Sequence, residues 1–383
     1  MKGFLNANVY VENQGIIKIN LAFENGKIVY IGDDKSLITE PIEISEDQIV
    51  LPGFIDEHIH GAGGCDAMDG TLSALSTIAN SIASEGTTCF LATTMTQSPE
   101  NISKAMTAVK EYMATQATTG AQLLGIHLEG PFISSKHVGA QPPQFVVAPD
   151  CKVFDRYFEQ SGKAIKIVSL APEVDGSLAL ISHLASLGVV ASAGHTDSGY
   201  ADIEKAMQFG LSNITHTFNA QKPLHHREIG TVGSALLLDG LSTEAICDTI
   251  HLSIPAIKLL IKNKPHDKFI LITDSMRAKN LGEGESELGG QKVFVKDGQA
   301  RLQDGTLAGS ILRMNDAIKN LVEKCDIALT DAVDFATINP AKNLGVADTK
   351  GSIKAGKDAD FAIINNNYEV VLTIRNGNII FSK

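Results

Sequence analysis

The sequence has few cysteines, and their spacing does not indicate disulfide pairs. Its five cysteines are scattered and contain no C-x-x-C pair, which favours reduced thiols in the cytoplasm over a disulfide framework. No apolar run reaches the roughly 18 residues that a membrane helix needs, and the amino terminus has no apolar stretch typical of a signal peptide. We therefore expect a cytoplasmic protein that does not act on a membrane.

Positive charge is also scarce, with 32 Lys and Arg against 44 Asp and Glu, a formal net charge of −12. Such an excess disfavours nucleic acid and anionic membranes as main partners, although a few local cations can still hold the phosphate of a small molecule. The glycine-rich stretches Gly61–Gly64 and Gly282–Gly290 are not followed by G-K-[ST], so neither predicts a P-loop. The first could allow a ligand to contact its backbone or could be a flexible loop, and we expect the second to be a solvated loop.

Both ends of the chain have the pattern of short β-strands. Residues 1–50 and 346–383 contain alternating or β-branched segments, separated by turns such as Glu24-Asn25-Gly26 and Asn376-Gly377-Asn378. We predict that they assemble into one small β-sandwich domain built from both chain termini. Residues 51–345 are then left for a larger domain of a different class.

This middle segment alternates apolar runs with helical patterns such as Leu72–Glu85 and Asp202–Phe209. The alternation predicts an α/β fold with a parallel sheet, and eight such units predict a closed (β/α)8 barrel of the TIM type. The eight runs are Gly53–His60, Thr88–Met95, Leu123–Gly130, Ile165–Glu173, Val189–Thr196, Asn213–Ala220, Glu244–His251 and Phe269–Met276.

Ionisable side chains stand near the carboxyl ends of most of these runs. Those ends form the catalytic face of a (β/α)8 barrel, and ionisable groups are otherwise uncommon in buried strands. His58 and His60 are two residues apart, so a strand would point both imidazoles to one side. Histidine with carboxylate predicts a divalent metal, with Zn²⁺ or Fe²⁺ as the best match. The converging set would be His58, His60, Glu129, His195, His216 and Asp274.

Five short motifs give the chain a family likeness. They are PGFIDEHIHG (residues 52–61), GIHLEGPF (125–132), SAGHTDS (192–198), THTFNAQ (215–221) and ITDSM (272–276). The first resembles the first-strand signature of the amidohydrolase superfamily, and the five together resemble the N-acetylglucosamine-6-phosphate deacetylases over essentially the whole chain. The resemblance implies hydrolysis of N-acetyl-D-glucosamine 6-phosphate to D-glucosamine 6-phosphate and acetate by metal-activated water. It also implies a homodimer in which the neighbouring subunit supplies part of the phosphate pocket.

The resemblance assigns roles position by position. Glu129, His195 and His216 match the principal metal ligands, and the intact His58-x-His60 pair resembles the branch that holds two ions, with Glu129 as the bridge between them. Asp274 matches the catalytic base and acid. The implied substrate-binding positions are Ala140, Gln141, Asn219, Ala220, Arg227, His251, Leu307, Ala308 and Gly309.

Gln141 departs from the family pattern. Many members carry a histidine after a Gly-Ala or Gly-Thr pair near the active site, and here the sequence is Gly139-Ala140-Gln141. A glutamine amide can donate a hydrogen bond but cannot become a cation. The acyl-group contact and the preferred sugar epimer therefore stay open, and N-acetylgalactosamine 6-phosphate is an alternative substrate.

Single residues help to distinguish alternative functions of the barrel and alternative roles of Arg227. A cyclic-amide hydrolase of the dihydroorotase type would need a carboxylated lysine at the end of the fourth run, but Lys166 lies near its start. A non-catalytic scaffold barrel would usually have lost its metal ligands, whereas all six candidates are present here. Arg227 suits a phosphate because its planar fork can bind two oxygens, yet it could instead be a surface or interface residue.

Overall fold

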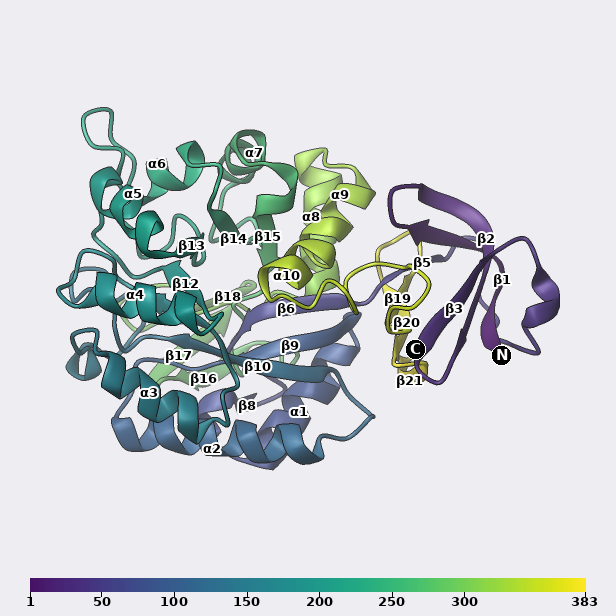
Figure 1. Ribbon diagram of the computed structural model, residues 1–383, viewed down its shortest axis with the longest axis horizontal. Helices are drawn as coiled ribbons and strands as arrows, with labels where there is room; N and C mark the ends of the chain where they lie inside the picture. Colours follow the sequence, from purple (N-terminus) through teal and green to yellow (C-terminus); the bar gives the residue numbers. More distant parts are fainter.

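The computed structural model describes residues 1–383, with a barrel on one side and a smaller β-sheet on the other (Figure 1). Eight parallel strands form the barrel in the order β15-β14-β13-β12-β11-β10-β9-β6, which confirms the predicted (β/α)8 fold. They are β6 (Phe54–Ile59), β9 (Thr87–Thr93), β10 (Gln122–Glu129), β11 (Ile165–Leu170), β12 (Val190–Ala193), β13 (Leu211–Ile214), β14 (Ser242–Ile246) and β15 (Phe269–Ile272).

Helices cover the outside of the barrel, and their sequences show why they form. In α1, Leu75, Ile78 and Ile82 recur at helical spacing and are buried, while the Thr71 side chain caps the helix by accepting from the Ala74 N–H. The helices are α1 (Leu72–Ala83), α2 (Pro99–Thr115), α3 (Cys151–Gln160), α4 (Ser177–Ser186), α5 (Tyr200–Phe209), α6 (Gly230–Leu237), α7 (Ile254–Asn263), α8 (Met314–Cys325), α9 (Leu329–Phe335) and α10 (Ile338–Asn343). None of them combines the length and the apolar character needed to cross a bilayer.

The barrel closes between β6 and β15 through individual polar contacts. The Asp274 N–H donates to the His58 carbonyl at 2.8 Å, and the His60 N–H donates to the Ser275 carbonyl at 2.9 Å. Deeper in the seam, the buried Asp56 carboxylate accepts from both the N–H and the hydroxyl of Thr273. These contacts fix the segment that carries Asp274 directly beside the strand that carries His58 and His60.

Strands from both ends of the chain form one further sheet, in the order β21-β20-β19-β5-β1-β2-β3, with β4 paired to β1. Both termini lie in this part of the molecule (Figure 1). Its core brings Phe361 within 5.5 Å of Phe23 and 5.8 Å of Phe4 between ring centroids, and burying one such ring stabilises the fold by about 1.5–3 kcal/mol. The strands are β1 (Lys2–Val11), β2 (Gly15–Glu24), β3 (Lys27–Gly32), β4 (Glu40–Pro41), β5 (Ile49–Pro52), β19 (Phe361–Ile364), β20 (Val370–Arg375) and β21 (Asn378–Ser382).

The predicted small β domain from both termini is thus part of the fold. We propose residues 1–50 with 346–383, and residues 51–345, as the two domains. At the boundary, β5 pairs with β1 on one side and with β19 on the other, so the chain enters the barrel directly from this sheet.

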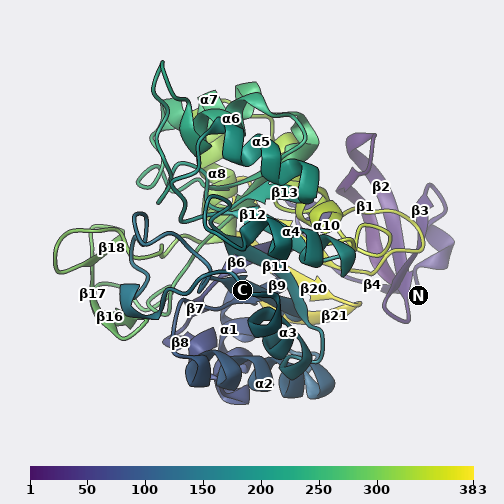
Figure 2. The same ribbon diagram turned by 60° about the vertical axis from the view of Figure 1, so that its left-hand side comes forward.

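The segment Gly282–Gly290, predicted as a solvated loop, instead contains a β-strand and a hairpin turn. It belongs to a three-stranded antiparallel sheet of β16 (Gly284–Leu288), β17 (Gln291–Lys296) and β18 (Gln299–Leu302), which forms a lobe beside the barrel (Figure 2). The prediction was wrong because Leu288 packs into a small core with Val293 and Met95, although the intervening glutamates are solvated. A second short hairpin, β7 (Gly61–Ala62) and β8 (Cys65–Asp66), follows β6.

Candidate metal centre

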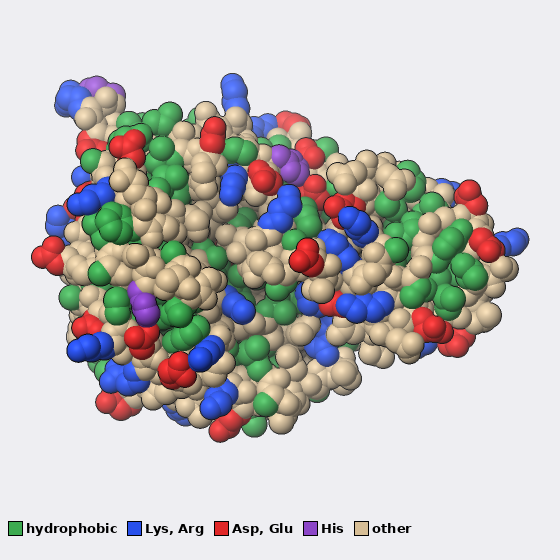
Figure 3. Space-filling model, in the orientation of Figure 1, with side chains coloured by type: hydrophobic (Ala, Val, Ile, Leu, Met, Phe, Trp, Pro, Cys, Tyr) green, Lys and Arg blue, Asp and Glu red, His purple; other side chains and the backbone are tan.

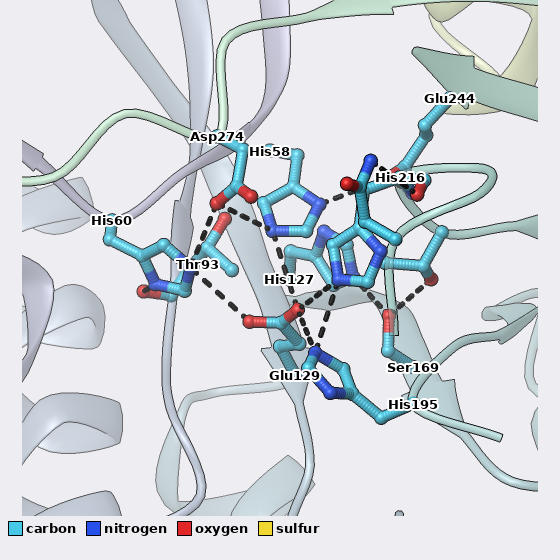
Figure 4. A network of polar contacts seen from close by, with 12 residues as sticks. His58, His60, Thr93, His127, Glu129, Ser169, His195, His216, Glu244 and Asp274 are labelled. Atoms are coloured by element: carbon cyan, nitrogen blue, oxygen red, sulfur yellow. Dashed lines mark hydrogen bonds and ion pairs between the residues drawn. The ribbon is translucent and has the colours of Figure 1, made fainter. Parts of the chain in front are cut away.

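The six ionisable side chains predicted from the strand ends meet at the carboxyl rim of the barrel (Figure 4). His58 lies within β6 and Glu129 ends β10, whereas the other four lie in the segments that follow β6, β12, β13 and β15. All six are buried. They form two groups whose ligand atoms lie within 4.8 Å of one another: Glu129, His195 and His216, and His58, His60 and Asp274.

The first group has the geometry of a cation site. Glu129 Oε1 lies 3.1 Å from His195 Nε2 and 3.0 Å from His216 Nε2, and the two Nε2 atoms are 3.1 Å apart. Ligands at the usual distance of about 2.0–2.1 Å from a tetrahedral metal are about 3.3 Å from one another. This triangle of ligand atoms therefore fits a divalent cation of the Zn²⁺ or Fe²⁺ class.

The second group shares Glu129 with the first. His60 Nε2 lies 3.2 Å from both Glu129 Oε2 and Asp274 Oδ1. His58 Nε2 lies 3.5 Å from Asp274 Oδ1 and has no hydrogen-bond partner although it is fully buried. Because an unpartnered buried nitrogen is costly, this atom fits a second cation. The two oxygens of Glu129 face the two groups, so the carboxylate can bridge them.

Neighbouring acceptors fix how two of the histidines are protonated. His60 Nδ1 is 3.2 Å from the Thr93 carbonyl, and His195 Nδ1 is 2.9 Å from the His137 carbonyl. A carbonyl can only accept, so Nδ1 of each ring donates to it, and Nε2 is the nitrogen that faces the centre and can offer its lone pair to a cation. The imidazoles are thereby oriented as metal ligands by the fold itself.

Three of the candidate residues have left-handed backbone conformations. The φ angles are 49° at His195, 28° at His216 and 47° at Asp274, and each such conformation costs a non-glycine residue about 1–3 kcal/mol. Hydrogen bonds hold the strained turns: the Ser310 N–H donates to the Asp274 carbonyl at 2.8 Å. These turns redirect the side chains from the strand ends towards the barrel axis, and such strain is concentrated at functional sites.

Electrostatics at the rim favour an ionised Asp274. Burial alone would raise the pKa of its carboxyl, but His58 and His60 outweigh burial and lower that pKa to about 2. Burial disfavours the charged form of His60, yet its hydrogen bonds to Asp274 and Glu129 raise the pKa of its imidazole to about 10. Since a metal ligand must be neutral imidazole, a cation that binds at His60 would release a proton.

Comparison with known proteins identifies the family. The model of the amidohydrolase family matches residues 49–380. The chain belongs to the amidohydrolase family. It is 45% identical to the N-acetylglucosamine-6-phosphate deacetylase of Bacillus subtilis (strain 168) over 377 residues, which cover 97% of this chain and 95% of that one. The predicted resemblance to that group of enzymes is confirmed.

Two more relatives bear on the substrate. The N-acetylgalactosamine-6-phosphate deacetylase of Escherichia coli O157:H7 is 32% identical over 344 residues, which cover 89% of this chain and 91% of that one. A Mycobacterium smegmatis N-acetyl-D-glucosamine-6-phosphate deacetylase mutant, solved in complex with N-acetyl-D-glucosamine-6-phosphate, superimposes with a TM-score of 0.92 at 27% identity and covers both chains fully. The two ligand groups agree with the metal dependence of the amidohydrolase family.

A cavity of about 210 Å³ opens directly onto the metal-ligand candidates of this amidohydrolase. Ala308 is fully buried between two of its lining residues. Met95, Gly139, Leu288 and Thr306, which the sequence did not single out, also line the cavity. The predicted substrate-binding residues that line it are Ala140, Gln141, Asn219, Ala220, His251, Leu307 and Gly309.

Gln141 is held by Glu129 and Thr96 instead of projecting freely into the cavity. Its Nε2 donates to Glu129 Oε2 at 2.8 Å, and its Oε1 accepts from the Thr96 N–H at 2.7 Å. The amide therefore orients the Glu129 carboxylate. A histidine at this position would place a different donor against Glu129.

Arg227 lies away from the cavity of its own chain. It sits in the exposed segment between β13 and α6, which protrudes from the barrel (Figure 1) and carries a cluster of basic and histidine side chains at its tip (Figure 3). Its Nη1 lies 2.8 Å from His226 Nε2. The predicted substrate contact of Arg227 is therefore not part of the cavity that its own chain forms.

Sequence reasoning missed the layer of polar residues beneath the rim. His127 Nε2 lies 2.7 Å from Ser169 Oγ, and Glu244 Oε2 lies 2.9 Å from His58 Nδ1 (Figure 4). His127 is two residues before Glu129 on β10, so the strand period that paired His58 with His60 would also have placed it on the inner face. No pattern in the local sequence indicates that Glu244 contacts His58, because only the pairing of the barrel strands brings Glu244 of β14 close to that histidine.

Proposed function

We propose that this amidohydrolase removes the acetyl group of N-acetyl-D-glucosamine 6-phosphate, releasing D-glucosamine 6-phosphate and acetate. The observation that carries the proposal is the Glu129 carboxylate, which faces two groups of ligand atoms and, with Asp274, lines a cavity of about 210 Å³. The similarity to the Bacillus subtilis deacetylase along nearly the whole chain supports the choice of substrate.

The residues of the chain suggest how the amide is cleaved. One or two divalent ions, Zn²⁺ or Fe²⁺, held by Glu129, His195 and His216 and by the His58–His60 pair, would polarise the acetyl carbonyl and acidify water at neutral pH. Asp274 takes the proton of the attacking water and returns it to the departing sugar nitrogen.

The cavity wall would orient the sugar. His251 faces the cavity while its Nδ1 is held 2.6 Å from Asp248 Oδ2, which leaves Nε2 for the substrate. The remaining substrate contacts that we propose come from Ala140, Gln141, Asn219, Ala220, Leu307, Ala308 and Gly309. The small-molecule substrate and the reduced cysteines support a cytoplasmic location.

We expect acetate release from the gluco substrate to exceed release from N-acetylgalactosamine 6-phosphate by about 5- to 150-fold in kcat/KM, because differences confined to one hydroxyl contact are worth about 1–3 kcal/mol. Both epimers should be assayed on one enzyme sample whose metal content is measured in parallel. Gln141 and the Escherichia coli relative make the galacto epimer the second candidate, and a reversed preference would select it. A metal-loaded sample that releases acetate from neither would contradict the proposed function.

We further propose a homodimer in which Arg227 of one subunit contacts the phosphate bound by the other. Arg227→Ala should then lower kcat/KM for the phosphorylated substrate by about 100-fold, as expected for a lost charged hydrogen-bond pair. It should leave unphosphorylated N-acetylglucosamine nearly unaffected. The exposed Arg156 on α3 provides the control, Arg156→Ala.

Mixed dimers test the contribution across the interface. A dimer of one Arg227→Ala subunit and one Asp274→Asn subunit contains one cavity with both native residues only if the arginine comes from the partner. Mixed dimers isolated after coexpression of the two variants should show about half of the activity of the unsubstituted dimer. Absence of any recovery, or equal losses on both substrates, would rule out this role.

A further inference from the structure

Beneath the two ligand groups, the Glu244 carboxylate is fully buried within β14. It accepts three hydrogen bonds. Oε2 accepts from His58 Nδ1 at 2.9 Å and from the His216 N–H at 3.1 Å, and Oε1 accepts from Asn213 Nδ2 at 3.1 Å. One oxygen therefore contacts a candidate ligand from each metal group (Figure 4).

This arrangement differs from the way His60 and His195 are held. Backbone carbonyls orient those two imidazoles, which fixes the tautomer without placing a charge in the interior. Burying a carboxylate costs several kcal/mol unless it is well compensated. A carboxylate behind a ligand histidine makes the imidazole a stronger metal ligand, and removing such a partner typically lowers metal affinity 10–100-fold.

The consequence for His58 is specific. With its Nδ1 proton held by Glu244, the lone pair of Nε2 faces the gap between Glu129 Oε1 at 3.7 Å and Asp274 Oδ1 at 3.5 Å. That nitrogen has no protein partner. His58 is therefore prepared for a cation in the second group, whereas the three ligands of the first group do not depend on the tautomer of His58.

We propose that Glu244 is a positioning residue that determines whether the second ion, at His58 and His60, is bound. The carboxylate sets the tautomer of His58 and strengthens its Nε2 as a ligand. The carboxylate also accepts from the His216 N–H and so supports the left-handed turn at His216. Glu244 therefore contacts one residue of each group. The inference rests on the metal centre of the proposed function.

Glu244→Gln tests the charge while keeping the shape. The Asn213 amide can turn to meet the new amide group, because its Oδ1 has no hydrogen-bond partner. Chains stripped with a chelator should be titrated with Zn²⁺, with bound metal counted by elemental analysis. We expect the unsubstituted chain to bind two ions. The variant should keep the first ion with little change and bind the second about 10–100-fold more weakly.

Glu57→Gln is the matched control. Glu57 is equally buried and neighbours Glu244, but its side chain bonds Asn343 and none of the metal-ligand candidates, so both ions should remain. If Glu244→Gln does not fold, Glu244→Asp applies the same test, because the shorter side chain withdraws the carboxylate from His58 without removing its charge. His58→Gln should cause the same selective loss, and adding Glu244→Gln to it should have little further effect on the first ion.

Parallel loss of both ions in Glu244→Gln, or affinities equal to those of Glu57→Gln, would overturn the inference. So would a single ion in the unsubstituted chain. The proposed function is judged separately: a chain that binds two ions, loses only one in Glu244→Gln and yet releases no acetate would sustain this inference while contradicting the deacetylase.

Discussion

Asp274→Asn should lower kcat for acetate release by about 10³- to 10⁴-fold and leave the first metal ion in place. Asparagine has nearly the same shape as aspartate but cannot take up a proton, and a positioned general acid–base typically contributes 10²–10⁴-fold. Asp274 is not among the three ligand atoms of the Glu129, His195 and His216 group, so the metal content of that group should persist. Turnover and bound metal should be measured on the same preparation.

Asp267→Asn is the matched control, since this aspartate is exposed on the segment before β15 and should behave like the unsubstituted chain. Near-normal turnover in Asp274→Asn would refute the proton-transfer role. Complete loss of metal together with turnover would instead make Asp274 an essential ligand. A large loss of kcat with the metal kept and little change in KM separates the proposed role from both, because it indicates an interaction made mainly in the transition state.

The sequence was sufficient where local chemistry and fold geometry coincide. The barrel strands are short apolar runs with ionisable residues at one end, and the carboxyl ends of parallel strands share one rim. His58 and His60 were placed together by the strand period alone. The observed strands begin within two residues of the predicted runs but end one to six residues earlier, and the rim does gather all six predicted side chains.

The sequence was insufficient where position depends on register or on another part of the chain. Glu244 lies in a buried strand, and only the pairing of β14 with β13 and β15 places it below His58. The β16–β18 sheet was missed because glycine and glutamate dominate β16, while its packing comes from Leu288 and from Met95 of a distant segment. Arg227 shows the same limit. The residues around it do not indicate that its segment protrudes from the barrel and lies away from the cavity.

Glu129→Gln should have the broadest effect on the metal centre, because Glu129 is the candidate ligand whose two carboxylate oxygens face the two groups. Its carboxylate lies within 3.2 Å of His60, His195 and His216, and no other carboxylate lies that close to the Nε2 atoms of His195 and His216. A neutral amide oxygen is a weaker ligand and cannot offset the repulsion between two cations. Acetate release should fall by about 10³-fold or more, since acidification of water by the metal is lost with the ion.

Metal binding itself provides the decisive comparison for Glu129. Excess Zn²⁺ at about 1,000 times its dissociation constant stabilises a folded protein by about 4 kcal/mol, so the unsubstituted chain should gain several degrees in Tm when metal is added. Glu129→Gln should gain little, whereas Glu244→Gln should keep the gain that comes from the first ion. If Glu129→Gln retained both ions and the full gain in Tm, each group would have to bind its ion without the shared carboxylate. That result would contradict the proposal that Glu129 bridges the two ions.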